Sequence, residues 1–230
     1  MLAELFKYKT NSVSWDDSRT KLRSYRRDHI TRTLNKGRFY EGEFLQVIAR
    51  RYGGGGTFVD VGAFIGNHSI FFAKHCQAEN VIAFEPFPET YRLLLHNVQA
   101  NGLGSQIRCE QKAVGKEQGM ATMSIVSNTN MGMNRIDMAG GTAVAVTNLD
   151  AELANFDGEL RFLKIDAEGQ GSNVLLGAQA TIDRFKPVIA VEIDPEPFEV
   201  IEQVLRTHGY VAKEQYNATP TWIFEHHSRG

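Results

Sequence analysis

The 230-residue chain has no long apolar run, because none of its hydrophobic stretches approaches the about 20 residues that a membrane-spanning helix needs. Its first residues, "MLAELFKYKT", contain no apolar core of signal-peptide length, so we expect a cytoplasmic protein. It has only two cysteines, Cys76 and Cys109, whose spacing forms neither a metal motif nor a disulfide framework. The net charge of −2 argues against a protein that binds nucleic acid or a membrane surface with its whole exterior.

The dinucleotide fingerprint G-x-G-x-x-G is also missing. In its place the run "TFVDVGAFIGNHS" puts Gly62 and Gly66 four residues apart, between a short apolar strand and a helical pattern. Asp60 precedes this turn, and its carboxylate would repel a pyrophosphate but attract an ammonium group. The turn therefore favours a ligand with a cationic amino-acid end over NAD.

From residue 57 onward, strand-like and helix-like patterns alternate. Such alternation predicts a mainly parallel sheet with helices on both faces, whose ligands bind beyond the carboxyl ends of the strands. We expect residues 1–52 to form an N-terminal helical segment that packs on the core or caps it. Residues 53–230 should form a single domain that binds the ligand. The predicted strands are 57–62, 81–86, 107–115, 161–166, 187–193, 210–215 and 221–226, with an antiparallel pair at 120–126 and 142–148; the predicted helices are 18–35, 41–52, 67–76, 88–101, 171–184 and 196–208.

The second strand of the alternating region ends in Glu85. An acidic side chain at this point of an α/β sheet can accept hydrogen bonds from both hydroxyls of an adenosine ribose. Pro86 and Phe87 follow directly and can form an apolar wall against the adenine. Together, Asp60 and Glu85 fit a ligand with an ammonium at one end and a ribose at the other.

Several motifs occur in an order that resembles the FkbM family of S-adenosylmethionine-dependent methyltransferases. They span about residues 37–193 and include "RFYE", "FVDVGAFIGNHSIFFA", "VIAFEPFPETYRLLLHNVQANG", "KAVG", "NMG", "LKIDAEGQGSNVLLGA" and "PVIAVEI". The resemblance implies the Rossmann-like class I methyltransferase fold, a three-layer α/β structure with a seven-stranded sheet and an antiparallel last strand. It also implies S-adenosylmethionine as cofactor, S-adenosylhomocysteine as product and a hydroxyl acceptor on a polyketide, sugar or glycolipid.

The resemblance carries site roles to individual residues of this chain. The methionine end of the cofactor is expected at Gly62, Ala63 and Gly66, its amino group near Asp60, its ribose at Glu85 and its adenine beside Pro86, Phe87, Ala113 and Val114. Asn67 and His68 are expected within reach of the cofactor carboxylate or the acceptor, and Tyr40 and Glu41 at the edge of the cofactor or simply at a helix start. Where the family often has Asn, this chain has Phe64, and Gln170 stands where many members have a second acid.

The run "LKIDAEG" supplies candidates for a base that would take the proton of the acceptor hydroxyl. Asp166, at the tip of a strand, is the first candidate, followed by Glu168, Glu192 and His68. A cofactor contact remains open for Asp166, and Lys164 either pairs with it as a buried ion pair or contacts the acceptor. Asp166, Glu168 and Glu192 could also offer oxygens to Mg²⁺, but no fixed spacing supports a metal site, and we predict none. The loop residues Asn130, Gly132 and Asn134 are predicted to line the acceptor site.

Residues 19–38 carry eight Lys or Arg residues and Asp28 as the single acid, a local charge that stands out in this chain. Such a run is commonly a solvated helix face, but it also fits an anionic acceptor.

The leading hypothesis is a methyltransferase acting on a small or glycan-like hydroxyl compound, with monomer and homodimer both open. RNA ribose or a peptide as acceptor, a catalytically silent cofactor-binding protein and a nicotinamide oxidoreductase are the alternatives; a nucleic-acid partner is not favoured, because no RNA-binding module is evident.

Overall fold

A seven-stranded sheet forms the centre of the protein, in the order β12-β13-β11-β10-β3-β4-β5. The structure is a computed structural model that describes residues 7–125, 134–136, 141–194 and 196–229. Five adjacent strands pair in parallel, and β13 lies antiparallel to both β11 and β12, so the expected seven-stranded sheet with its antiparallel last strand is confirmed. The strands are β3 (Thr57–Val61), β4 (Asn80–Phe84), β5 (Ile107–Glu110), β10 (Leu160–Ile165), β11 (Val188–Glu192), β12 (Tyr210–Tyr216) and β13 (Thr221–His226).

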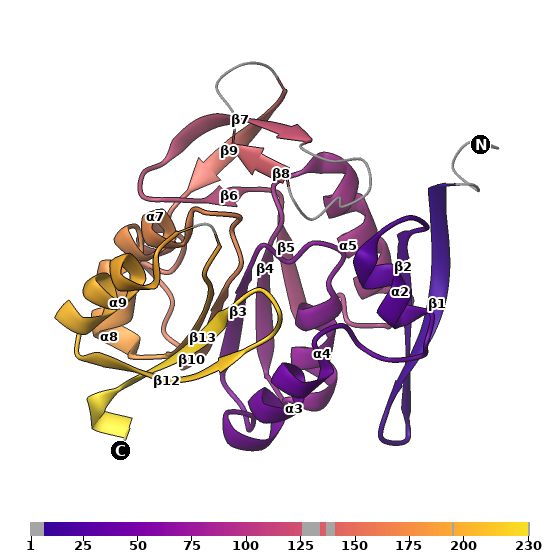
Figure 1. Cartoon of the computed structure of the whole chain (residues 1–230), viewed down its shortest axis with the longest axis horizontal. Helices are drawn as coiled ribbons and strands as arrows, with labels where there is room; N and C mark the ends of the chain where they lie inside the picture. Colours follow the sequence, from indigo (N-terminus) through magenta and orange to yellow (C-terminus); the bar gives the residue numbers. More distant parts are fainter. Residues whose placement is uncertain (1–6, 126–133, 137–140, 195, 230) are drawn as a thin grey trace.

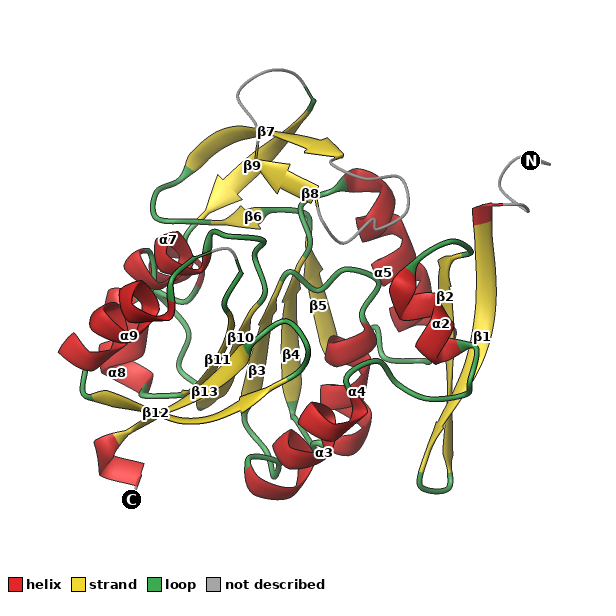
Figure 2. Ribbon diagram, viewed as in Figure 1, coloured by secondary structure: helices red, strands yellow, loops and turns green. Residues whose placement is uncertain are grey.

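Helices cover both faces of this sheet, as Figures 1 and 2 show. One face carries α3 (Gly42–Arg51), α4 (Asn67–His75) and α5 (Pro88–Ala100); the other carries α7 (Gly171–Leu176), α8 (Gln179–Phe185) and α9 (Phe198–Thr207). Every residue of β3 is buried, and so are all but the last residue of β11, because helices cover both faces of the sheet. Among the described residues, no helix is long and apolar enough to cross a membrane.

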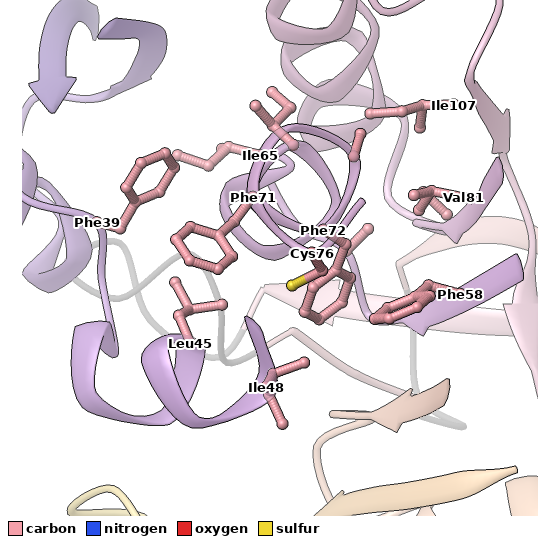
Figure 3. Packing of buried hydrophobic residues seen from close by; sticks show 14 of the residues in the cluster. Phe39, Leu45, Ile48, Phe58, Ile65, Phe71, Phe72, Cys76, Val81 and Ile107 are labelled. Atoms are coloured by element: carbon pink, nitrogen blue, oxygen red, sulfur yellow. The ribbon is translucent and has the colours of Figure 1, made fainter. Parts of the chain in front are cut away.

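The core on the α4 face is rich in aromatic side chains. In Figure 3, Phe71 and Phe72 of α4 lie between Leu45 and Ile48 of α3 and Phe58 of β3. The rings of Phe58 and Phe72 are 5.3 Å apart, a distance at which aromatic pairs add stability beyond the area that they bury. This packing fixes the start of α4, which directly follows the glycine turn.

A smaller sheet of four strands lies beside the carboxyl ends of the main strands, in the order β6-β9-β7-β8. It contains β6 (Ala113–Val114), β7 (Gly119–Ile125), β8 (Asn134–Ile136) and β9 (Thr142–Thr147), and the short helix α6 (Leu149–Glu152) follows it. The predicted antiparallel pair is confirmed as β7 and β9. The single strand predicted at 107–115 is wrong, because the chain leaves β4 after β5 and pairs with β9 from Ala113 onward.

The predicted helix at 171–184 is interrupted between α7 and α8, at Gly177. The backbone of Gly177 lies so close to Gly115 that a Cβ atom would stand 2.1 Å from its carbonyl oxygen. Any other residue at this position would therefore collide with the segment between β6 and β7.

The predicted helix at 18–35 is wrong over its first half. A hairpin of β1 (Tyr8–Trp15) and β2 (Ser18–Tyr25) comes first, and only α2 (His29–Leu34) is helical. Thr20, Leu22 and Ser24 point inward, and the charged residues between them point outward, which is the two-residue period of a strand. Two of these inward positions carry polar Thr and Ser. A prediction based on apolar residues alone could therefore not detect the alternation. The boundary predicted at residue 52 stays a prediction, although Val13 and Leu22 share one core cluster with Phe58 of the main sheet.

Candidate active site

A cavity of about 210 Å³ opens where the main sheet strands β3, β4, β10 and β11 end, the position that the fold predicts for a ligand. Val61 and Gly62 form part of its floor, and Tyr40 and Phe64 belong to its wall. Its charged lining is mainly acidic: Glu85, Asp166, Glu168, Glu192 and Asp194 face it, with His29 and Lys112 as the basic members. A cation is therefore favoured inside this cavity over a pyrophosphate.

The glycine turn connects β3 to α4 and has both of its glycines in the left-handed region, Gly62 at φ +79° and Gly66 at φ +87°. The amides of Gly62 and Ala63 both donate to the carbonyl of Phe84, at 3.0 and 2.9 Å, which ties the turn to the end of β4. A Cβ atom on Gly62 would stand 1.7 Å from the carbonyl oxygen of Asp166. Glycine is required here because the loop after β10 presses directly against the turn.

Phe64 also adopts a left-handed conformation, with φ +50°. Asparagine visits this region more readily than phenylalanine does, so the departure from the family pattern carries a backbone cost. In this conformation the amide of Phe64 donates a hydrogen bond to Oε2 of Glu85 at 3.0 Å. At position 64 it is thus the backbone amide, and not the side chain, that contacts Glu85.

Glu85 lies in the cavity wall with 6% of its surface exposed. Its Oε1 accepts from the amide of Phe87 at 2.9 Å, while Oε2 accepts from Phe64. Burial raises the pKa of this carboxyl to about 7, although both amide hydrogen bonds oppose the shift. Each oxygen has accepting capacity left, so the ionised group can still receive two hydroxyl donors.

Below the cavity, Lys164 is 2% exposed and Asp60 is fully buried. The Nζ atom of Lys164 lies 3.5 Å from Oδ1 of Asp60 and 3.1 Å from Oδ2 of Asp166, and Ser69 donates to Oδ2 of Asp60 at 2.6 Å. Burial works against the charge of Lys164, but Asp166 and Asp60 outweigh it and raise its pKa. Neither Asp60 nor Lys164 reaches the cavity surface, so Asp60 supports the site from beneath, and the ion-pair reading of Lys164 agrees with this geometry.

The first residues of α4 hold the N-terminal segment against the cavity. Asn67 exchanges two hydrogen bonds with the backbone of Tyr40, and His68 Nε2 lies 2.9 Å from Oε2 of Glu41. Burial disfavours the Glu41 carboxylate, yet its contact with His68 keeps its pKa below the ordinary value. Of these four residues only Tyr40 lines the cavity. The contacts proposed between Asn67, His68, Glu41 and a cofactor stay predictions.

The three acidic candidates for the base, Asp166, Glu168 and Glu192, all line the cavity, whereas His68 lies behind its wall. The side chain of Asp166 is 27% exposed and keeps its contact with Lys164. Burial and the nearby Asp166 raise the pKa of Glu192, which makes Glu192 a more basic carboxylate than an exposed one. Within the described part of the chain, no cluster of His, Cys, Asp and Glu residues is arranged to hold a metal ion.

The remaining predicted site residues fall into two groups. Pro86, Ala113 and Val114 line the cavity, and Phe87 is buried; their contact with an adenine stays a prediction. Asn130 and Gly132 lie outside the described residues, and Asn134 begins β8.

Sequence reasoning missed several cavity residues, among them His29, Lys112 and Met123. His29 Nε2 lies 3.2 Å from the hydroxyl of Tyr40, so the two side chains form one wall. The chain bends after β2, and this bend brings His29 to the cavity. Because residues 18–35 were predicted to form one helix, the bend was not expected. Lys112 and Met123 arrive through the change of sheet after β5, which the sequence pattern did not show either.

Known proteins share this architecture. The family model described as the methyltransferase FkbM domain matches residues 60–212, and no curated protein matches the chain significantly. A solved structure of methyltransferase FkbM from Methylobacillus flagellatus KT has a TM-score of 0.56 and 17% identity, covering 76% of this chain and 44% of that chain. TrmK of M. capricolum, solved with S-adenosylhomocysteine, has a TM-score of 0.51 and 13% identity and covers 79% and 66%.

A conserved hypothetical protein of Streptococcus pyogenes has a TM-score of 0.52 and 8% identity, covering 83% of this chain and 98% of that chain. The chain thus spans less than half of the first of these proteins and about two thirds of the second. At these identities the likeness demonstrates the common fold, the Rossmann-like fold of class I methyltransferases.

Proposed function

This chain belongs to the FkbM methyltransferase family, and from this premise we propose that it transfers a methyl group from S-adenosylmethionine to a hydroxyl of a small-molecule acceptor such as a sugar, a glycolipid or a polyketide-like compound. The acidic cavity at the strand ends is the observation that carries this proposal. Its five carboxylates suit a ligand that carries both a sulfonium and an ammonium charge. A nicotinamide dinucleotide, which brings two phosphate charges, would be repelled by the same lining.

The residues present fit the cofactor. Glu85 would hold the two ribose hydroxyls, one on each carboxylate oxygen, and Pro86, Ala113 and Val114 would border the adenine. Gly62, which lines the cavity and has no side chain, would let the methionine end approach the turn closely. The bound cofactor supplies the electrophilic methyl group and its own leaving group, so the protein's part is to align the acceptor and exclude water.

Methylation of an alcohol also requires that the hydroxyl proton be removed. Asp166 stands at the tip of β10, on the cavity surface, and the ammonium of Lys164 keeps its carboxylate in place. Glu192 lies at the end of the adjacent strand, where burial and the nearby Asp166 raise its pKa and favour its protonated form. We assign Asp166 as the first proton acceptor, with Glu192 and Glu168 as the other carboxylates of the same wall.

Thermal unfolding of the dialysed protein with S-adenosylmethionine, S-adenosylhomocysteine or NAD tests the cofactor. At a hundred times its Kd, a ligand that binds only the folded state stabilises it by about 2.7 kcal/mol. We expect both adenosyl compounds to raise the Tm and NAD to leave it unchanged. Stabilisation by NAD and by neither adenosyl compound would refute the proposal. Incubation with methyl-labelled cofactor and a metabolite extract would then identify the acceptor from the labelled product, and label on a nitrogen or carbon atom would refute O-methylation.

A further inference from the structure

Positive charge is concentrated at the start of the chain. The first 38 residues contain ten Lys or Arg residues against four Asp or Glu, whereas the rest contains fifteen against twenty-three. The net charge of −2 therefore conceals a basic N-terminal segment joined to an acidic domain. None of the Lys and Arg residues of the hairpin lines the acidic cavity. The proposed methyl transfer therefore does not account for this positive charge.

The hairpin places three of these cations in a row on its outer face. In the strand register Thr10 lies opposite Arg23, Ser12 opposite Lys21 and Ser14 opposite Arg19. Arg19 and Lys21 are exposed and Arg23 is half-buried, and within the described part of the chain none of the three takes part in a salt bridge. The acids of the hairpin, Asp16 and Asp17, lie in its turn and not on this face. We call these six side chains, three cations and three hydroxyls, the basic hairpin face.

The strand that carries the cations is held from its edge. On α5, Asn97 accepts from the amide of Arg23 and donates to its carbonyl, at 2.7 and 2.9 Å, and Asn101 does the same for Lys21, at 3.1 and 2.8 Å. The spacing matches, because four residues of helix and two residues of strand both rise about 6–7 Å. The cations are thus presented about 7 Å apart on a fixed strand.

The basic hairpin face also leads to the cavity. After β2 the chain continues through the exposed residues Arg26 and Arg27 into α2, whose His29 lines the cavity wall. Figure 1 shows β2 running beside α5 toward the side of the molecule where α2 lies. A linear anion bound along β2 would therefore extend toward the cavity.

The sequence did not favour a nucleic-acid partner, but from these structural observations we propose that the basic hairpin face binds the phosphodiester backbone of single-stranded RNA. Arg, Lys, Ser and Thr side chains are the usual partners of phosphate oxygens, and a single row of cations suits one strand of phosphates. A membrane surface fits less well. Among the described residues, the large exposed apolar side chains are Met120, Val200 and Val211, none of them in the hairpin, so this face has nothing to insert between lipids.

RNA binding at this face is independent of which hydroxyl the enzyme methylates. The test is fluorescence anisotropy of a labelled 20-nucleotide poly-U RNA, titrated with the full chain between 50 and 200 mM KCl. The hairpin variant carries Arg19→Gln, Lys21→Gln and Arg23→Gln. The matched control loses the same charge at exposed sites elsewhere, through Arg50→Gln, Lys116→Gln and Arg206→Gln. Thermal unfolding and the Kd for S-adenosylmethionine, which are measured for all three proteins, report on folding and on the cavity.

We expect the hairpin variant to bind the RNA at least tenfold more weakly at 100 mM KCl, and the control to stay within about threefold of the wild type. The slope of log K against log[KCl] should fall by about 2, since each phosphate contact to a single strand contributes about 0.7. Absence of RNA binding by the wild type at 50 mM KCl would overturn the proposal, as would equal weakening of both variants. So would binding to phosphatidylserine vesicles that depends on the three cations while RNA does not bind. Since the cofactor Kd is read separately, failure here leaves the proposed methyl transfer intact.

Discussion

Asn67 pairs with the backbone of Tyr40 on both sides: its Oδ1 accepts from the Tyr40 amide and its Nδ2 donates to the Tyr40 carbonyl, both at 3.1 Å. The first residue of α4 thereby holds the segment that supplies the tyrosine wall of the cavity. The same arrangement recurs where Asn97 and Asn101 hold β2. Asparagine side chains of α4 and α5 thus hold the backbone of the N-terminal segment at Tyr40, Arg23 and Lys21.

Asn67→Ala should lower the free energy of unfolding by about 2 kcal/mol, because it leaves an amide and a carbonyl of Tyr40 without partners. Urea denaturation measures the change. The control is Asn155→Ala at an exposed position, which should alter stability by less than about 0.5 kcal/mol. Equal stability of the Asn67 variant and the wild type would show that the pairing contributes nothing to folding.

Gly62→Ala should be strongly destabilising, by more than about 3 kcal/mol, since the added Cβ would stand 1.7 Å from the carbonyl oxygen of Asp166 and the backbone has φ +79°. Loss of soluble protein, or a Tm lower by about 6–12 °C or more, would agree with this expectation. Gly104→Ala, at a glycine with open space around it, should leave the Tm within a few degrees. A stable Gly62 variant would contradict the close contact between the turn and the loop after β10.

Cofactor affinity should rise with pH through neutrality. The folded-state pKa of Glu85, about 7, lies above its ordinary value of 4.5, so without ligand this group's contribution to stability is present below pH 4.5 and is lost as the pH rises through 7. Ribose hydroxyls bind the carboxylate form, so they favour its ionisation. We expect the Kd for S-adenosylhomocysteine, measured by isothermal titration calorimetry, to fall several-fold from pH 6 to pH 8.

Two variants isolate the contribution of Glu85 to this pH dependence. Glu85→Gln should flatten the profile because it removes the titrating group, and Glu85→Ala should weaken binding by at least about 1.4 kcal/mol, or tenfold. If the Kd of Glu85→Ala equals that of the wild type, the ribose assignment is wrong. A pH profile that survives in Glu85→Gln would instead point to Glu192, whose pKa is also raised.

Asp166→Asn should lower kcat by about 100-fold or more and change the cofactor Kd by less than about threefold, because a base acts on the acceptor and not on the bound cofactor. The rate is measured as transfer of labelled methyl to the acceptor that the extract experiment identifies. Asp157→Asn, at an exposed position in the loop before β10, serves as the control. An unchanged rate would remove Asp166 from this role, and Glu192→Gln would become the next variant to measure.

The sequence by itself determined the main sheet and the place of the cavity. Buried parallel strands need uninterrupted apolar runs, and the acids and glycines at the ends of those runs, such as Asp60, Gly62, Glu85 and Asp166, must meet at one edge. Local patterns carry this information, so it can be read without a structure.

Only the tertiary structure decided which of these side chains line the cavity. Glu85 and Asp166 reach the cavity, whereas Asp60 and Lys164 form an ion pair beneath it, because burial depends on what packs above each side chain. Residues 18–25 became a strand since Asn97 and Asn101 could satisfy its outer edge, a contact across more than 70 positions of sequence. His29 entered the cavity for the same reason: its place is set by distant contacts, which no local pattern records.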